Sequence, residues 1–445
     1  MRGVRGEYRR PLAVVLAATV LGCGGIFAAA VERTGTDGPV RHTDPPHQDA
    51  RAATTAEKAA WIGTWSAAPV EPAPSHAQAA REPRSIRNVI HTSIGGTTAR
   101  ITLTNRYGGH RPLRVDAASL AVRAEGAAAV PGTLRRVTFA GGRPYVTIPP
   151  GADAVSDPVP LAVPYDGDLL VTLYVPAGAP TTRHPVARQT SYAADGDHTR
   201  EVSGAAYTEA PAPTWHHLAA VDVVNPAARG AVLVLGDSLT DGVGSTRDAN
   251  HRWPDLLADR LRSRGYGVVN QGIGGNRVLR DGRGPSALSR FERDALSRPG
   301  VRTVVICLGI NDIIRPPHET DPRRITDGLT ALTRQAHARG LRVVGSTLLP
   351  FGGHRRYTKE LEAVRQQVNA TIRTGGVFDA VVDFDRALRD PYAPTRLLPA
   401  YDSGDGLHPG DAGYRHMART VDLAELTALA ALAALADGGA PRQDL

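Results

Sequence analysis

The chain has 445 residues, which is long for a single core and indicates two domains with additional segments. Its formal net charge is +8, but the arginines are scattered among acidic residues and no run of five or six like charges occurs. The composition therefore disfavours a nucleic-acid partner and indicates a surface of mixed charge.

Residues 1–30 have the pattern of an export signal. A basic stretch, MRGVRGEYRR, precedes an apolar stretch at 11–30 that ends in three alanines. We expect cleavage after Ala30 and a secreted, extracellular protein. The apolar stretch is about 20 residues long, so an uncleaved anchor on the outer face of the plasma membrane is the alternative, and membrane contact is expected only in that case.

Three further segments follow in the chain. Residues 31–59 are polar, rich in Pro, Thr and Ala, and are expected to form a flexible linker. Residues 60–224 contain short β-branched runs bounded by Gly and Pro, as in 99–109, 143–151 and 168–178. This pattern predicts an all-β sandwich or jelly-roll domain.

From residue 230 apolar strands alternate with helical stretches, which predicts a doubly wound parallel α/β sheet with helices on both faces. The expected strands lie within residues 231–238, 267–275, 302–312, 341–350 and 380–384. The expected helices include 253–265, 325–339, 359–373 and a last helix that runs from Asp411 into the Leu/Ala-rich C-terminus. We assign residues 230–437 to this domain and 438–445 to a tail.

Cysteine is rare, with Cys23 in the export segment and Cys307 in an apolar strand. Removal of the signal would leave Cys307 without an intramolecular disulfide partner. A small buried core residue is favoured over a nucleophile or a metal ligand.

In the sequence VLVLGDSLTDG at residues 232–242, a serine follows the end of a predicted apolar strand. Ligands of open α/β sheets bind beyond the carboxyl ends of the strands, where Ser238 is expected to lie. Ser238 alone is ambiguous, because a Gly-Asp-Ser turn can also cap a helix. The nucleophile elbow G-x-S-x-G is not matched, since Thr240 occupies its last position.

Two more polar turns follow predicted strands. In NQGIGGN at 270–276, the glycines allow a ligand to approach backbone N–H groups closely, although a tight turn explains the pattern equally. The spacing of its glycines does not fit a dinucleotide-binding fingerprint. In LGIND at 308–312, Asn311 either caps a turn or points its amide at an oxyanion.

The fourth piece is DGLHPGDAG at 405–413, where Asp405 precedes His408 by three residues. This spacing allows a carboxylate to orient the imidazole and to stabilise its charged form, whereas a solvated loop histidine is the simpler interpretation. All four pieces are expected at one rim of the sheet. Together they supply a nucleophile, a base, an orienting acid and oxyanion donors, which are the groups needed for acyl transfer.

These four blocks resemble those of the SGNH hydrolases, also called GDSL esterases and lipases. Gly236 to Leu239 is similar to the first block, 270–275 to the second, Asn311 to the third and 405–409 to the last, with Ile310 where the family often has glycine. The resemblance, which spans about 231–418, implies a flavodoxin-like fold and a serine esterase that forms an acyl-enzyme. The stretch from Trp61 to Ser66 resembles the start of an extra domain of some secreted bacterial members.

The resemblance also implies roles for individual residues. Ser238 would be the nucleophile, His408 the general base and acid, and Asp405 the residue that orients His408. The backbone N–H groups of Ser238 and Gly275 and the side chain of Asn311 would form the oxyanion hole. No metal and no organic cofactor is implied.

The substrate is left open by the sequence. A small-molecule or lipid ester, a polysaccharide O-acetyl group and acyl transfer to another acceptor all use the same residues. A non-enzymatic, glycan-binding protein would be expected to have lost a catalytic position. We also expect the segment 184–198 of the β domain to border the crevice and shape specificity, with its histidines as solvated loop residues.

Overall fold

The computed structural model describes residues 61–72 and 82–428. The predicted export segment, linker and C-terminal tail lie outside the described residues. Within those ranges, no helix is both long enough and apolar enough to cross a membrane.

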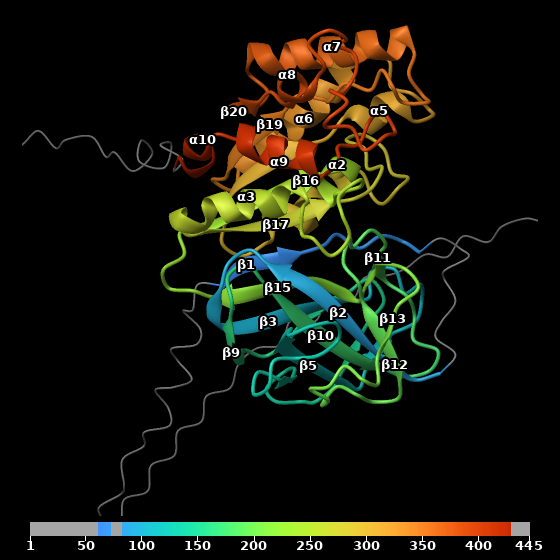
Figure 1. Ribbon diagram of the computed structural model, residues 1–445, viewed down its shortest axis with the longest axis vertical. Helices are drawn as coiled ribbons and strands as arrows, with labels where there is room; N and C mark the ends of the chain where they lie inside the picture. Colours follow the sequence, from blue (N-terminus) through green and yellow to red (C-terminus); the bar gives the residue numbers. More distant parts are fainter. Residues whose placement is uncertain (1–60, 73–81, 429–445) are drawn as a thin grey trace, which may run out of the picture. The chain divides into compact units, whose positions relative to one another are not determined.

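The first part of the chain forms two antiparallel sheets that share one apolar core (Figure 1). The first sheet has the order β1 (Trp61–Ser66), β15 (Leu218–Val224), β3 (Gly96–Thr104) and β8 (Asp153–Val155), with β9 (Val159–Val163) also paired to β3. The second has the order β13 (Thr208–Glu209), β12 (Tyr192–Asp195), β2 (Arg84–Thr92), β10 (Gly167–Val175), β5 (Ala117–Val122) and β6 (Arg135–Val137). Two small pairs join β4 (Leu113–Val115) to β7 (Val146–Ile148) and β11 (Arg183–His184) to β14 (Trp215–His216). We call this part the β region.

The second part forms a five-stranded parallel sheet, as the alternation of strands and helices predicts. Its order is β17 (Tyr266–Gly272), β16 (Gly230–Gly236), β18 (Val301–Cys307), β19 (Arg342–Ser346) and β20 (Ala380–Val382). This is the flavodoxin-like order 2-1-3-4-5, whose switch point lies between the first and third strands along the chain. Those strands are β16 and β18, and Ser238 follows β16.

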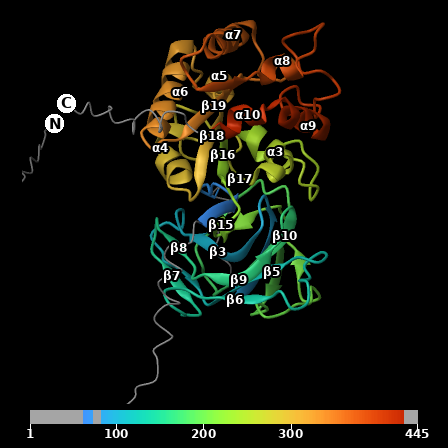
Figure 2. The ribbon, with the colours of Figure 1, turned by 90° about the vertical axis from the view of Figure 1, so that its left-hand side faces the viewer.

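The residues of β16 alternate between two apolar layers, because successive side chains of a strand point to opposite faces. Val232 and Val234 pack with Trp253 and Tyr414 of the helices α3 (Trp253–Leu261) and α9 (Asp411–Thr420). Leu233 and Leu235 belong to the core that includes α6 (Pro322–His337) and α7 (Lys359–Thr374). Figure 2 shows α3 and α9 on one face of the sheet and α4 (Ala287–Phe291) and α6 on the other.

The helix boundaries follow capping residues. Helix α6 begins three residues earlier than its apolar period predicts, because Asp321 accepts a hydrogen bond from the N–H of Arg323 and Pro322 fits the first helical turn. The shorter helices are α2 (Ser238–Asp241), α5 (Ile310–Ile314), α8 (Phe384–Leu388) and α10 (Leu423–Thr427).

The expected single C-terminal helix is wrong in one respect. Helix α9 ends at Thr420, and α10 starts only at Leu423, after Asp422 caps it by accepting from the N–H of Ala424. Aspartate competes for backbone groups and favours a cap over a helix interior.

The β region covers the edge strand of the parallel sheet. The hydroxyl of Ser93 accepts a hydrogen bond from the N–H of Val268 in β17 at 2.9 Å, and the hydroxyl of Ser66 donates to the carbonyl of Asn270 at 3.1 Å. Uncovered sheet edges expose unpaired backbone groups that promote association. The β region therefore satisfies backbone groups of the strand that leads into the second block.

Candidate active site

A cleft of about 1410 Å³ lies at the carboxyl ends of the parallel strands. Ser238, Asn311 and His408 line it together with residues of the β region, among them Val70 and His184. The cleft walls thus come from both parts of the chain.

The turn after β16 presents Ser238 to this cleft. Asp237 caps α2 by accepting from the N–H of Leu239 at 3.0 Å, and Ser238 is the first residue of that helix. Ser238 is only 7% exposed, so its hydroxyl sits in a largely enclosed position.

Ser238, His408 and Asp405 form a continuous hydrogen-bonded chain. The Nε2 atom of His408 lies 2.8 Å from the Ser238 hydroxyl, and its Nδ1 atom lies 2.6 Å from a carboxylate oxygen of Asp405. The other oxygen of Asp405 accepts from the backbone N–H groups of Leu407 and His408. The carboxylate is therefore fixed from two sides while it faces the ring.

The charge of Asp405 is stabilised in this arrangement. Partial burial raises the pKa of its carboxyl, but the hydrogen bonds from the backbone and side chain of His408 outweigh burial and leave this pKa below its ordinary value. An ionised Asp405 can stabilise a positively charged His408.

Gly275 lies at the same rim in a left-handed conformation, with φ +81°. A side chain at this position would be strained and would also meet the guanidinium of Arg315. In the part of the chain that the structure describes, the backbone N–H groups of Ser238 and Gly275 donate to no other residue. Both N–H groups thus remain available to a ligand.

Asn311 is held in a defined orientation. Its amide nitrogen donates to Asp237 at 3.0 Å, and its amide oxygen accepts from Arg315 at 2.8 Å. A primary amide has two N–H donors, and the second one donates to no residue in the part of the chain that the structure describes. The contact with Asp237 is a role that the sequence did not predict.

Comparison with known proteins identifies the second part of the chain. Residues 234–416 match the model of the GDSL-like Lipase/Acylhydrolase family. These residues form a GDSL-like lipase/acylhydrolase domain. Members of this family are esterases of the lipase and acylhydrolase type, and in this chain the β region precedes the domain as an additional N-terminal part.

Solved structures with similar folds align to less than half of the chain. A GDSL-like lipase from Bacteroides thetaiotaomicron is 20% identical, and the match covers 45% of this chain and 90% of that one with a TM-score of 0.35. A carbohydrate acetylesterase from Sinorhizobium meliloti is 19% identical, with 46% and 99% covered and a TM-score of 0.33. A lipolytic protein of the G-D-S-L family from Veillonella parvula is 18% identical, with 43% and 94% covered and a TM-score of 0.32. No curated protein matches the chain.

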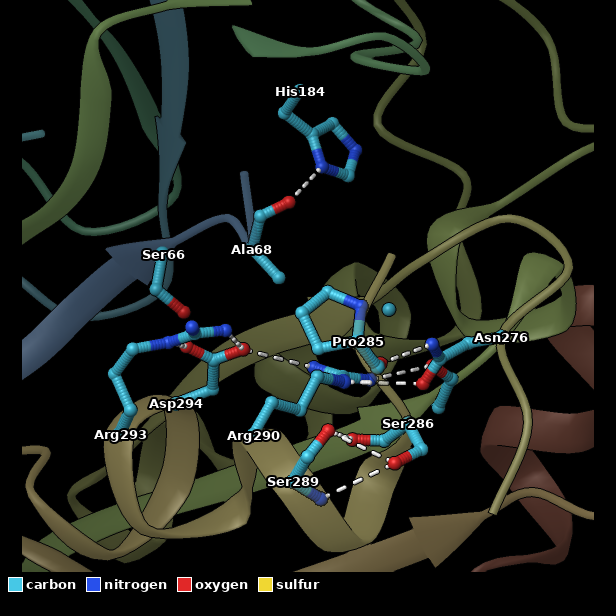
Figure 3. A network of polar contacts seen from close by, with 12 residues as sticks. Ser66, Ala68, His184, Asn276, Pro285, Ser286, Ser289, Arg290, Arg293 and Asp294 are labelled. Carbon is cyan, nitrogen blue, oxygen red and sulfur yellow. Dashed lines mark hydrogen bonds and ion pairs between the residues drawn. The ribbon is translucent and has the colours of Figure 1, made fainter. Parts of the chain in front are cut away.

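A buried arginine ties two blocks of the GDSL domain together (Figure 3). Arg290 is fully buried, and it donates to the side chain of Asn276 at 3.1 Å and to the carbonyl of Gly236 at 3.1 Å. Asp294 lies 3.4 Å from Arg290 and also accepts from Arg106 of the β region. This network fixes the strand end before Ser238 relative to the loop that carries Gly275.

His184 is a functional candidate that the sequence did not reveal. Its side chain is 3% exposed, and its Nε2 atom lies 2.8 Å from Asp241 of α2, while its Nδ1 atom faces the carbonyl of Ala68. The second oxygen of Asp241 accepts from the N–H of Gly274, next to Gly275. A histidine of the β region thus supports the loop of the GDSL domain that carries Gly275, and the expectation of a solvated residue is wrong for it.

The predicted specificity segment is corrected in extent. His184, Pro185 and Val186 line the cleft, whereas residues 188–195 do not. Tyr192–Asp195 form β12, which pairs with β2 and β13 in the second sheet. This part of the segment is structural because its backbone completes a sheet.

Neither a metal site nor a reactive cysteine appears in residues 61–72 and 82–428. No group of three or more His, Cys, Asp or Glu side chains is arranged there to hold a metal ion. Cys307 is buried in β18, as predicted, and burial raises the pKa of its thiol to about 12. A thiol with such a pKa is a poor nucleophile at neutral pH.

Proposed function

We propose that the GDSL domain hydrolyses carboxylic esters through an acyl-enzyme on Ser238, with His408 and Asp405 as the other members of a catalytic triad. The observation that carries this proposal is the hydrogen-bonded chain from the Ser238 hydroxyl through both ring nitrogens of His408 to Asp405, at 2.8 and 2.6 Å. Distances of this size are within reach for proton transfer.

The first half of the reaction acylates the enzyme. Nε2 of His408 takes the proton of the Ser238 hydroxyl while its oxygen forms a bond to the ester carbonyl carbon. Asp405 stabilises the resulting imidazolium. As the tetrahedral intermediate collapses, the bond to the alcohol oxygen breaks, and His408 transfers its proton to that oxygen.

The second half reverses these roles. His408 takes a proton from water as the water oxygen attacks the acyl carbon, and then returns a proton to Ser238 as the acid leaves. In both halves the N–H groups of Ser238 and Gly275 and the second amide N–H of Asn311 are proposed to bind the oxyanion, a role for which preorganised donors are effective.

The test is the rate of ester hydrolysis by Ser238→Ala in the full chain. We expect loss of about 10⁴- to 10⁶-fold in kcat on 4-nitrophenyl acetate, because the members of a triad act as a unit. Ser297→Ala is the matched control, since this exposed serine lies outside the cleft residues and, among the described residues, its hydroxyl donates only to the carbonyl of Arg293. A Ser238→Ala enzyme that keeps more than a few per cent of the rate contradicts the proposal.

The class of ester is tested with a panel. 4-Nitrophenyl esters of graded chain length, triglyceride, phospholipid and acetylated xylan separate a short-acyl esterase from a lipase and from a polysaccharide O-acetylesterase. Product analysis with and without an added alcohol separates hydrolysis from acyl transfer, which uses the same residues.

We further propose that the protein is exported. This proposal rests on the basic and apolar segments of residues 1–30. N-terminal sequencing of the protein recovered from culture medium tests it, with Val31 as the expected first residue. A protein that remains in the membrane fraction with residues 1–30 attached would favour the anchor instead.

A further inference from the structure

The active-site cleft carries an excess of arginine. Five arginines line it: Arg183, Arg283, Arg315, Arg355 and Arg356. They come from β11 of the β region, from the loop after β17, from the residue that follows α5, and from the loop between β19 and α7. Four separate segments of the chain thus bring cationic side chains to one cavity.

The acidic residues of the cleft do not neutralise these arginines. Asp241 is paired with His184, and Asp405 with His408. Asp281 accepts from the N–H of Ser286 and from the hydroxyl of Ser289. The remaining acidic residue of the lining, Glu71, is exposed.

None of the five arginines forms an ion pair within the described part of the chain, where many other arginines do. Arg315 uses its Nε atom to hold the amide oxygen of Asn311. The Nε atom of Arg183 is buried and has no hydrogen-bond partner among the described residues. A buried donor without a partner costs free energy that a ligand can recover.

The arginines also repel one another. Burial lowers the pKa of the Arg315 guanidinium, and the neighbouring charges of Arg356, Arg283 and Arg277 lower it further. Like charges held close together in a cleft destabilise the folded protein. Unfavourable interactions of this kind are expected at functional sites, where function requires them. A cleft lined by one sign of charge focuses the electrostatic field and attracts ligands of the opposite sign.

Two of the arginines belong to a loop that packs against the loop of His408. Arg355 and Arg356 follow His354, and the backbone of this loop packs against Gly406, in the loop that carries Asp405 and His408. His408 must reach the alcohol oxygen of the ester to protonate it. A substituent on the alcohol is therefore directed toward this loop.

We propose that the cleft binds esters whose alcohol part carries an anionic group, such as a carboxylate, with Arg355 and Arg356 as its main partners and the other arginines as the supporting field. The proposal rests on the proposed ester hydrolysis at Ser238 and adds the charge class of the substrate. Arginine suits this role because its planar fork binds carboxylate and phosphate oxygens in pairs.

The test compares two acetate esters whose leaving groups share one ring scaffold and differ in charge. 4-Acetoxybenzoate carries a carboxylate on the leaving group, and methyl 4-acetoxybenzoate is its neutral counterpart. We expect kcat/KM of the full chain to favour the anionic ester by about 10- to 100-fold, the range that one or two charge-assisted contacts provide, after correction for the difference in leaving-group reactivity measured with hydroxide. The preference should shrink as ionic strength rises.

The double variant Arg355→Gln/Arg356→Gln should lose most of this preference. The matched control is the double charge change Arg323→Gln/Arg324→Gln on α6, whose residues lie outside the cleft lining. It alters the net charge of the protein equally and should keep the wild-type preference. A wild-type enzyme that hydrolyses both esters without preference, or a preference that the Arg355→Gln/Arg356→Gln enzyme retains, overturns the proposal and leaves ester hydrolysis intact.

A binding measurement keeps the proposal testable without turnover. In the Ser238→Ala protein, 4-acetoxybenzoate should bind about 10-fold more tightly than its methyl ester by calorimetry, and Arg355→Gln/Arg356→Gln added to Ser238→Ala should abolish the difference. Equal affinity for the two esters overturns the anionic subsite even if the chain hydrolyses no ester at all. Failure of hydrolysis with preserved selective binding would instead count against the proposed function alone.

Discussion

Replacement of His184 by alanine tests whether the β region supports the catalytic site. The change removes the imidazole that lies 2.8 Å from Asp241, in a pair where both side chains are 3% exposed. Asp241 would then keep the N–H of Gly274 as its remaining hydrogen-bond partner among the described residues. Burial lowers the pKa of the His184 imidazole, but the contact with Asp241 outweighs burial and raises it, so the buried carboxylate would lose a partner that favours the charged pair.

The expected loss of stability follows from this burial. Removal of one partner of a buried ion pair costs about 3–5 kcal/mol, because the other charge stays buried without compensation. We expect the free energy of unfolding to fall by that amount in urea titrations followed by fluorescence.

Catalysis should fall as well. The carboxylate of Asp241 holds the N–H of Gly274, so its displacement moves the adjacent Gly275. A shift of about 1 Å in a positioning group can cost about 100-fold in rate, and we expect kcat on 4-nitrophenyl acetate to fall by about 10- to 100-fold with little change in KM.

Two further variants separate this role from a general packing effect. His184→Gln keeps a nitrogen donor near the position of Nε2 and should recover most of the lost kcat. His198→Ala removes a half-buried histidine that pairs with Glu201 inside the β region, and it should change stability by at most about 1 kcal/mol and leave kcat unaltered. A His184→Ala enzyme with wild-type stability and wild-type kcat would refute the supporting role.

Three other perturbations have defined outcomes. Asn311→Ala should lower kcat by about 10²- to 10³-fold, the effect of one lost oxyanion donor, and an unchanged kcat would reduce Asn311 to its contacts with Asp237 and Arg315. Burial raises the pKa of Asp237 to about 7 in the folded protein, so its contribution to stability is complete below pH 4 and is lost as pH rises through 7. The unfolding free energy of the native chain should fall by on the order of 4 kcal/mol between pH 4 and 8 from this group alone, and that of Asp237→Asn should lack this fall. Parallel pH profiles of the two proteins would contradict the assignment. EDTA should leave the esterase rate unchanged, and activity that EDTA removes and zinc restores would require a metal in the mechanism.

Much of the fold is readable from the sequence, because its signals are local. The apolar run at 232–235 predicts a buried parallel strand, and β16 agrees with this prediction. The polar turn after it predicts a site at the strand end, where Ser238 begins α2 and lines the cleft. The five predicted strands occur in the predicted part of the chain. Helix ends differ where a cap decides the boundary, as at Asp321 and Asp422.

The spatial relation of the two parts is not encoded in local patterns. Nothing in the neighbourhood of His184 marks it as the partner of Asp241, which lies 57 residues further along the chain. The same holds for the hydroxyls of Ser66 and Ser93, which satisfy backbone groups of β17. Contacts of this kind depend on how two separately patterned parts pack, and the family blocks contain no information about the β region.

The cluster of arginines in the cleft could not be predicted from the sequence for a similar reason. Arginine is abundant throughout this chain, and single residues such as Arg183 and Arg315 carry no pattern. Their common location becomes visible only in the fold, where four segments bring them to one cavity. The serine and histidine blocks, in contrast, are recognisable because each combines several residues at fixed spacing.

The central claim, that Ser238 is the nucleophile, is tested most directly by covalent labelling. The full chain is treated with a fluorophosphonate, which reacts with activated serine hydroxyls, and the labelled residue is located by peptide mass spectrometry. We predict one adduct, on Ser238, whose formation parallels the loss of esterase activity and is absent in His408→Ala. Complete inactivation with Ser238 unmodified, or labelling of a different serine that accounts for the lost activity, would contradict the claim.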